Sequence, residues 1–173
     1  MGDGAEGAAV TADLVRVQIA PAEELQLHRL VQDFRDLIGA DRDLADPALA
    51  RLTPSPYPND VEAAREFRTA TEADLLGRRD ADAATVSAAL ASIEDDLAGM
   101  SDDDAFAERE VAIPVEDIDA WLRTLTAIRL VIATRLGIDS EEDHDPVDVR
   151  FGVYDWLGYR LELLIEAAEE LGV

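Results

Sequence analysis

Two arginines in the C-terminal third of the chain occupy positions where a cation could bind an anion. Arg129 falls among apolar residues of one helical pattern, and Arg160 does the same in the next. A guanidinium that faces an apolar surface needs carboxylate or carbonyl partners, because an unpaired buried charge is strongly destabilising. With the nearby Arg135, these residues predict an arginine-lined pocket for a small anion, in a sensor or in an enzyme.

The same two arginines also fit a purely structural interpretation. Each could form an ion pair in the core, or extend its charged end to the surface along an apolar stem. Asp74, Asp155 and Glu162 are the candidate carboxylate partners. The sequence alone does not decide between an anion-binding pocket and a structural ion pair.

An acidic segment, residues 141–145, contains the ligand types of a divalent-cation site. It has four carboxylates and His144, and hard cations favour carboxylate oxygens. It lacks the alternating ligands, the central glycine and the distal glutamate of an EF-hand loop. We therefore expect a solvated acidic loop and no metal site.

Motifs for catalysis or cofactor binding are not found in the sequence. His28 and His144 are its only histidines, and neither fits a Ser-His-Asp arrangement. The glycines near the start follow no strand and precede no helix, as a phosphate-binding loop would require. The chain has no cysteine, which excludes disulfides, thiolate metal sites and cysteine nucleophiles. We expect no cofactor and a non-enzymatic role, with the arginine-pocket enzyme as the alternative.

Four aromatic residues of the last two helical patterns suggest a second kind of site. If they gather at the surface, they would form a hot-spot patch for a protein partner or for a second copy of the chain. Alternatively, Trp121 and Trp156 belong to the core. The four residues are Trp121, Tyr154, Trp156 and Tyr159.

Two short aliphatic segments, each followed by a proline, predict strands. One covers residues 13–19 before Pro21, and the other covers residues 109–113 before Pro114. Neither segment is long enough to be stable alone, so we expect the two to pair as a two-stranded sheet. The alternative is a pair of unrelated extended segments.

The rest of the chain has apolar residues at helical spacing. The predicted fold is mainly α, a compact bundle of about five to six helices with the small sheet. Glycines are expected to end most of these helices. The predicted helices run from Pro21 to Gly39, from Asn59 or Asp60 to Gly77, from Asp80 or Asp82 to Gly99, from Val115 to Gly137, and from Pro146 or Val147 onward.

Composition limits the classes of partner. The chain has 173 residues, 48% of them hydrophobic, which fits one domain at residues 13–173 after a disordered tail at residues 1–12. Its net charge of -24 would repel the phosphates of a nucleic acid. The acidic start is unlike a secretory signal, and no apolar run could span a bilayer. We expect a cytoplasmic protein that binds neither membranes nor nucleic acid.

Several segments resemble an uncharacterised actinobacterial family of unknown function. Family members often have Asn-Asp in place of Thr126-Ala127 and Gln in place of Leu161, so a polar role that these positions have in the family does not carry over to this chain. The genes of this family often neighbour the gene for the adaptor of the Clp protease. The resemblance therefore implies a regulatory or adaptor role in protein turnover. The segments that carry it are residues 51–54, 66–68, 121–130, 134–137 and 154–157, with Tyr57 and Asp60.

These observations give a leading hypothesis and an alternative. The leading one is a non-enzymatic helical interaction or regulatory protein. It would bind a protein partner, or itself as a homodimer, through the face of the last two helices. The alternative is a small-anion sensor or enzyme that uses Arg129, Arg135 and Arg160.

Overall fold

The computed structural model describes residues 13–54, 56–57 and 59–172. The tail predicted at residues 1–12 lies outside this part of the chain. The two predicted strands are present as β1 (Leu14–Ile19) and β2 (Arg109–Pro114), and they pair antiparallel with Val15 opposite Ile113. The predicted sheet is therefore confirmed.

The sheet is stable because one of its faces packs on the rest of the molecule. Val15 and Ile19 of β1 and Ile113 of β2 are buried, whereas Arg16 and Gln18 alternate with them and are exposed. This two-residue period is that of a strand with one solvated face.

Four long helices make up most of the fold, which confirms the mainly helical class. They are α1 (Pro21–Ile38), α3 (Val61–Ala89), α6 (Ile118–Leu136) and α7 (Gly152–Glu170). Short helices connect them: α2 (Pro47–Leu52), α4 (Ile93–Ala98) and α5 (Asp102–Phe106). Three 3-10 turns, η1 (Val115–Asp117), η2 (Glu141–Asp143) and η3 (Val149–Phe151), complete the order.

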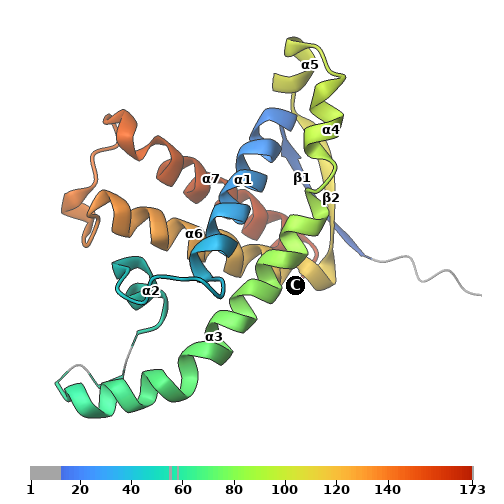
Figure 1. Ribbon diagram of the computed structural model, residues 1–173. Helices are drawn as coiled ribbons and strands as arrows, with labels where there is room; N and C mark the ends of the chain where they lie inside the picture. Colours follow the sequence, from blue (N-terminus) through green and yellow to red (C-terminus); the bar gives the residue numbers. More distant parts are fainter. Residues whose placement is uncertain (1–12, 55, 58, 173) are drawn as a thin grey trace, which may run out of the picture.

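The long helices pack against one another, with α6 in contact with α1, α3 and α7 (Figure 1). α1 runs beside the second half of α3, and α6 and α7 form an antiparallel pair that contacts α1 and β1. The main apolar core lies between these elements, where Leu27, Val31, Val86, Leu125 and Leu157 are almost completely buried.

Gly77 lies inside α3, and the prediction that it ends a helix was wrong. The helix continues to Ala89, and α4 follows as a separate element. An interior glycine costs a helix only about 1 kcal/mol relative to alanine. Packing supports the helix on both sides of it, since Leu76 is buried and Asp80 forms an ion pair of 2.9 Å with Arg35 of α1.

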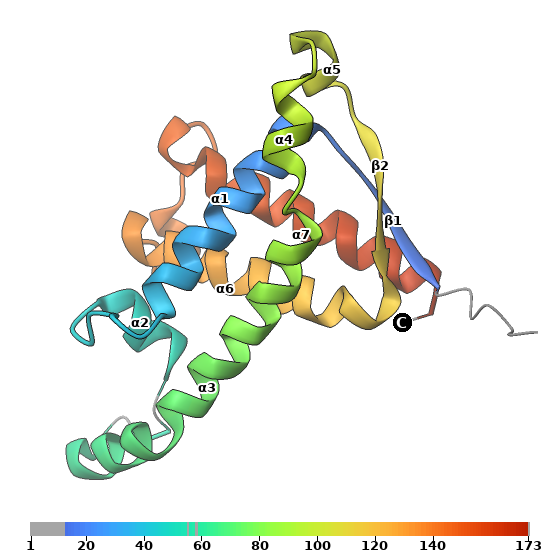
Figure 2. The same ribbon diagram turned by 45° about the vertical axis from the view of Figure 1, so that its right-hand side comes forward.

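The first half of α3 extends away from the rest of the molecule (Figures 1 and 2). Most side chains of residues 61–70 are exposed, and Val61 is 86% exposed. The buried residues of α3 all lie in its second half, from Leu76 onward. Tertiary packing therefore supports only the second half of this helix.

Both of the last two helices begin later than predicted, and α6 begins at Ile118, after η1, rather than at Val115. α6 ends at Gly137, whose φ of 74° is the left-handed conformation that glycine adopts readily, as the sequence predicts. α7 begins at Gly152 rather than at Pro146 or Val147. Asp148 instead caps η3, since its carboxylate accepts a hydrogen bond of 2.9 Å from the Arg150 backbone N–H.

None of the helices in the described part of the chain has the length and hydropathy of a membrane span.

Candidate functional site

A pocket of about 860 Å³ lies between α2, α6, the start of α7 and the loop that joins α6 to α7. Small-molecule sites in proteins usually have volumes of about 300–1,000 Å³. We term it the α6–α7 pocket. Its lining residues are Arg51, Thr126, Arg129, Leu130, Ala133, Ile138, Asp139, Ser140, His144, Tyr154 and Leu161. Two residues predicted for binding, Arg129 and Tyr154, are thus brought together.

Arg129 is the cation at the centre of the site. Its guanidinium carbon lies 3.9 Å from the centroid of the Tyr154 ring, and its Nε donates a hydrogen bond of 3.2 Å to the Tyr154 carbonyl. Within the described residues, no carboxylate lies at ion-pair distance from Arg129. Its positive charge is therefore stabilised by an aromatic face and a carbonyl, and its terminal nitrogens have no protein acceptor among those residues.

Gly158 allows Arg129 to lie against α7. A Cβ atom at this position would be 3.3 Å from both Nε and Nη2 of Arg129. Tyr154 and Gly158 are one helical turn apart and lie on the same face of α7. The guanidinium therefore contacts α7 where the helix has no side chain.

The Tyr154 ring contacts the ring of His144, which in turn contacts Phe151. The ring of His144 has its centroid 5.7 Å from that of Tyr154 and 5.0 Å from that of Phe151. His144 Nε2 lies 2.7 Å from Oδ1 of Asp155. These contacts hold the start of α7 against the loop and restrict the orientation of Tyr154.

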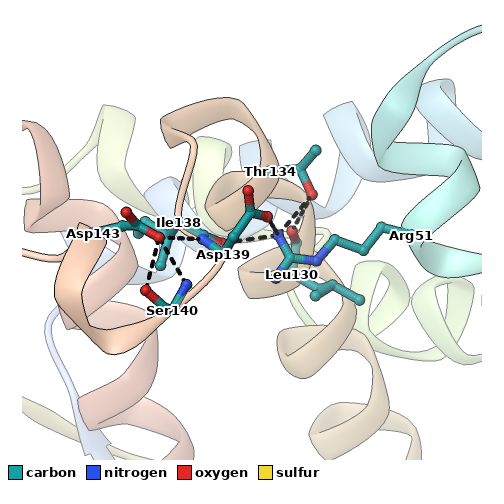
Figure 3. Close-up of polar contacts among 7 residues, drawn as sticks. All are labelled: Arg51, Leu130, Thr134, Ile138, Asp139, Ser140 and Asp143. Carbon is teal, nitrogen blue, oxygen red and sulfur yellow. Dashed lines mark hydrogen bonds and ion pairs between the residues drawn. The ribbon is translucent and has the colours of Figure 1, made fainter.

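α2 contributes the second cation of the pocket, Arg51, for local reasons. Asp46 caps this short helix by accepting a hydrogen bond of 2.8 Å from the Ala48 N–H, and Pro47 occupies the first turn. Arg51 Nη1 donates to the Ile138 carbonyl at 2.9 Å and lies 3.6 Å from Oδ1 of Asp139 (Figure 3). Arg51 is thus partly neutralised, which leaves Arg129 as the stronger anion-binding group.

The acidic loop is held by hydrogen bonds within itself. Asp143 Oδ2 accepts from the backbone N–H groups of Ser140 at 2.8 Å and Asp139 at 3.1 Å, and from the Ser140 hydroxyl at 3.0 Å (Figure 3). The N–H of Ser140 is the main cause that lowers the pKa of Asp143. In the part of the chain that the structure describes, no three His, Cys, Asp or Glu residues form a group that could hold a metal ion.

Arg135 and Arg160 lie outside the α6–α7 pocket. Arg135 pairs with both oxygens of Asp46, with its Nη1 2.9 Å from Oδ1, and so joins α6 to α2. Arg160 pairs with Glu23 of α1 and donates a hydrogen bond of 2.8 Å to the Gln18 carbonyl of β1. The three arginines therefore do not meet in one pocket.

The ion-pair partners proposed from the sequence for Arg129 and Arg160 were wrong. The partner of Arg160 is Glu23 rather than Asp155 or Glu162, and Asp74 contacts neither arginine among the described contacts. Sequence periodicity reports only which face of a helix is apolar. It cannot report which distant segment packs there.

Glu23 receives hydrogen bonds from three groups. Trp156 Nε1 donates at 2.6 Å, the Ala20 N–H donates at 3.1 Å, and Arg160 donates as well. Burial raises the pKa of Glu23, but the hydrogen bonds from Arg160, Trp156 and Ala20 outweigh it and lower the pKa below its ordinary value.

The four predicted aromatic residues do not gather in one surface patch. Trp121 is 5% exposed and belongs to the core, Trp156 is bound to Glu23, and Tyr154 lies in the pocket. Tyr159 is 52% exposed on α7.

Two residues of the site, Arg51 and Gly158, were not identified from the sequence. Arg51 gives no local signal, because its contact with Ile138 joins segments 87 residues apart. Gly158 does give a local signal, since a glycine inside a strong helical pattern often marks a place where another group packs closely against the helix.

The fold and the pocket define a mainly helical protein with an arginine beside an aromatic ring in a half-open pocket. Residues 5–168 match the family described as "Domain of unknown function (DUF2017)", and the chain belongs to this family. Comparison with curated proteins and with solved structures found no match.

Proposed function

We propose that this chain is a non-enzymatic regulatory protein that binds a small oxyanion, a carboxylate or a phosphate, in the α6–α7 pocket. The observation that supports it is Arg129, which lines the pocket and has no carboxylate partner among the described residues. A planar guanidinium binds two oxygens of a carboxylate or phosphate at once.

The arrangement of the other polar groups supports binding over catalysis. Ser140 and His144 line the same pocket, as a nucleophile and a base would. However, the Ser140 hydroxyl donates to Asp143, and Nε2 of His144 contacts Asp155. A nucleophile must be within hydrogen-bond reach of its base. No such contact joins these two residues in the described part of the chain.

A ligand in this pocket would touch four elements at once: α2, α6, α7 and the loop between the last two. Binding to the native state stabilises the arrangement that binds. The regulatory role follows from this, because a ligand would fix α2 and the loop relative to α7. In this proposal the role is cytoplasmic and belongs to protein turnover, as the family resemblance implies.

The test is a thermal-shift and calorimetric titration of the full chain with inorganic phosphate, sulfate and citrate. We expect at least one of them to raise the unfolding midpoint of the wild type. Arg129→Gln should abolish the rise. The control Arg16→Gln removes an arginine on β1, outside the pocket, and should retain it. The proposal is wrong if no anion acts, or if Arg129→Gln responds like the wild type.

A protein partner or a second copy of the chain is the other candidate ligand. It is favoured by apolar side chains that α7 exposes to solvent, namely Val153, Tyr159 and Ile165. Light scattering on the wild type and on Tyr159→Ala tests self-association. A dimer mass that Tyr159→Ala converts to a monomer mass would support it, and a monomer mass at high concentration would contradict it.

A further inference from the structure

A second pocket lies where α6 faces α3 and Phe34 of α1. It has a volume of about 730 Å³, and we term it the α3–α6 pocket. Thr126 lines both pockets, so the two adjoin at this residue of α6. Its other lining residues are Phe34, Leu75, Arg78, Arg79, Ala81, Asp82, Leu122, Arg123, Thr124 and Ala127.

The lining of this pocket combines apolar walls with an excess of positive charge. Phe34, Leu122 and Ala127 provide apolar surface, and three arginines face a single carboxylate, Asp82. That carboxylate is already paired, because Arg123 binds it through Nε at 2.9 Å and Nη2 at 3.3 Å. Arg78 and Arg79 have no ion pair within the described residues. This local excess of positive charge favours an anion, against the repulsion expected from the net charge of -24 of the whole chain.

Thr124 contributes a buried hydroxyl that has no hydrogen-bond partner in the described structure. The residue is 1% exposed. Other threonines in helices donate to the carbonyl four residues earlier, as Thr134 does to Leu130 at 3.0 Å and Thr85 does to Ala81 at 3.3 Å. A buried polar group without a partner is destabilising, so the Thr124 hydroxyl is a donor that a water or a bound molecule could satisfy.

Arg79 contributes a second unpartnered donor. Its Nη2 donates to the Leu52 carbonyl at 3.2 Å, but its Nε is buried with no acceptor among the described residues. Burial lowers the pKa of Arg79, and the charge of Asp82 offsets this effect only in part. A bound anion would stabilise the charged form of Arg79.

We propose that the α3–α6 pocket binds a small carboxylic acid with an aliphatic tail. The carboxylate would accept hydrogen bonds from Arg79 Nε and from the Thr124 hydroxyl. Both atoms are buried in the structure, so the side chains that line the pocket would move to admit it. The tail would pack against Phe34, Leu122 and Ala127. This site lies apart from Arg129 and does not depend on the function proposed above.

Hexanoate, titrated into the full chain by calorimetry, is the probe for this site. Acetate keeps the carboxylate without the tail, and hexanamide keeps the tail without the charge. We expect hexanoate to bind and both analogues to bind at least about tenfold more weakly. Acetate lacks the aliphatic tail that packs on the apolar walls, and hexanamide lacks the negative charge. Absence of hexanoate binding, or equal affinity for all three, would overturn the proposal.

Thr124→Val is the most informative variant, because valine has the shape of threonine without the hydroxyl. We expect about tenfold weaker hexanoate binding with an unfolding midpoint equal to or above that of the wild type, since an unpaired buried hydroxyl is removed. Thr85→Val, outside the pocket on α3, should bind hexanoate like the wild type. Equal affinity of Thr124→Val and the wild type would overturn the proposal.

Two arginine variants complete the test. Arg79→Lys keeps the charge but lacks Nε–H, and it should weaken hexanoate binding even if Thr124→Val does not fold. Arg129→Gln should leave hexanoate binding unchanged. Loss of binding in Arg129→Gln would place the carboxylate in the α6–α7 pocket and contradict the assignment. Failure of phosphate, sulfate and citrate to act through Arg129 would leave the hexanoate result unaffected.

Discussion

The guanidinium of Arg129 lies over the ring of Tyr154, 3.9 Å from its centroid, and its Nε donates to the carbonyl of the same residue. One residue of α7 thus holds the cation through both its side chain and its backbone. The aromatic face stabilises the charge without consuming the hydrogen-bond donors at the end of Arg129. The ring therefore positions the cation and leaves it able to bind an oxyanion.

Tyr154→Leu should weaken anion binding at the α6–α7 pocket. Cation–π contacts contribute about 0.5–2 kcal/mol, so we expect a loss of about two- to thirtyfold in affinity for the anion that raises the unfolding midpoint. Tyr154→Phe keeps the aromatic face and should bind like the wild type. Calorimetric titration of the two variants checks this. If Tyr154→Phe loses as much affinity as Tyr154→Leu, the ring face is not what holds Arg129.

Gly158→Ala should weaken anion binding without loss of stability. The added methyl would crowd Nε and Nη2 of Arg129 and displace a flexible side chain, while alanine favours the helix by up to about 1 kcal/mol. Gly77→Ala is the matched control, since no atom lies within 4 Å of a Cβ built there. It should stabilise α3 and leave binding unchanged. The role of Gly158 is refuted if Gly158→Ala binds the anion as tightly as the wild type.

Acid should remove the stability that Glu23 provides. Its pKa in the folded state is below the ordinary value of 4.5, so the carboxylate stabilises the fold above that value. This contribution decreases as pH falls through the lower folded pKa. Glu23→Gln should lose about 1–3 kcal/mol at neutral pH, because buried Arg160 loses its charged partner, and should show less loss in acid. Urea unfolding across this pH range tests it, with Glu110→Gln as the surface-pair control.

The first half of α3 should exchange its amide hydrogens faster than the second half. Local stability follows burial, and residues 61–70 are mostly exposed, whereas the second half contains Leu76, Ala83 and Val86 in the core. Hydrogen exchange of the full chain measures the difference between residues 61–72 and 76–88. Equal protection in the two halves would show that another part of the protein covers the first half.

The sequence predicts a helix or strand correctly where the residues that determine it lie within the same short segment. The two strands could be predicted because each is a short aliphatic segment followed by a proline, Pro21 or Pro114. Gly137 ends α6 as predicted, but Gly77 does not end α3. The difference depends on tertiary packing, because the ion pair of Asp80 with Arg35 supports the helix beyond Gly77.

The site could be predicted only in part. Arg129 and Tyr154 were identified because they interrupt or accompany apolar helical patterns. The pairing of Arg160 with Glu23 joins positions 137 residues apart, and no local spacing indicates it. The contribution of Arg51 depends in the same way on where α2 packs. Contacts between distant segments are set by the whole fold, and they decide which arginines are paired.

The most direct test of oxyanion binding by Arg129 is NMR of the arginine side-chain Nε–H signals during titration with phosphate, sulfate and citrate. The chain has 15 arginines and no lysine, so Arg129→Gln is needed to assign the Arg129 signal. Our account predicts that the Arg129 signal shifts and reaches saturation with at least one anion, while the Arg16 signal stays unchanged. An Arg129 signal that does not move at any concentration of the three anions would contradict it.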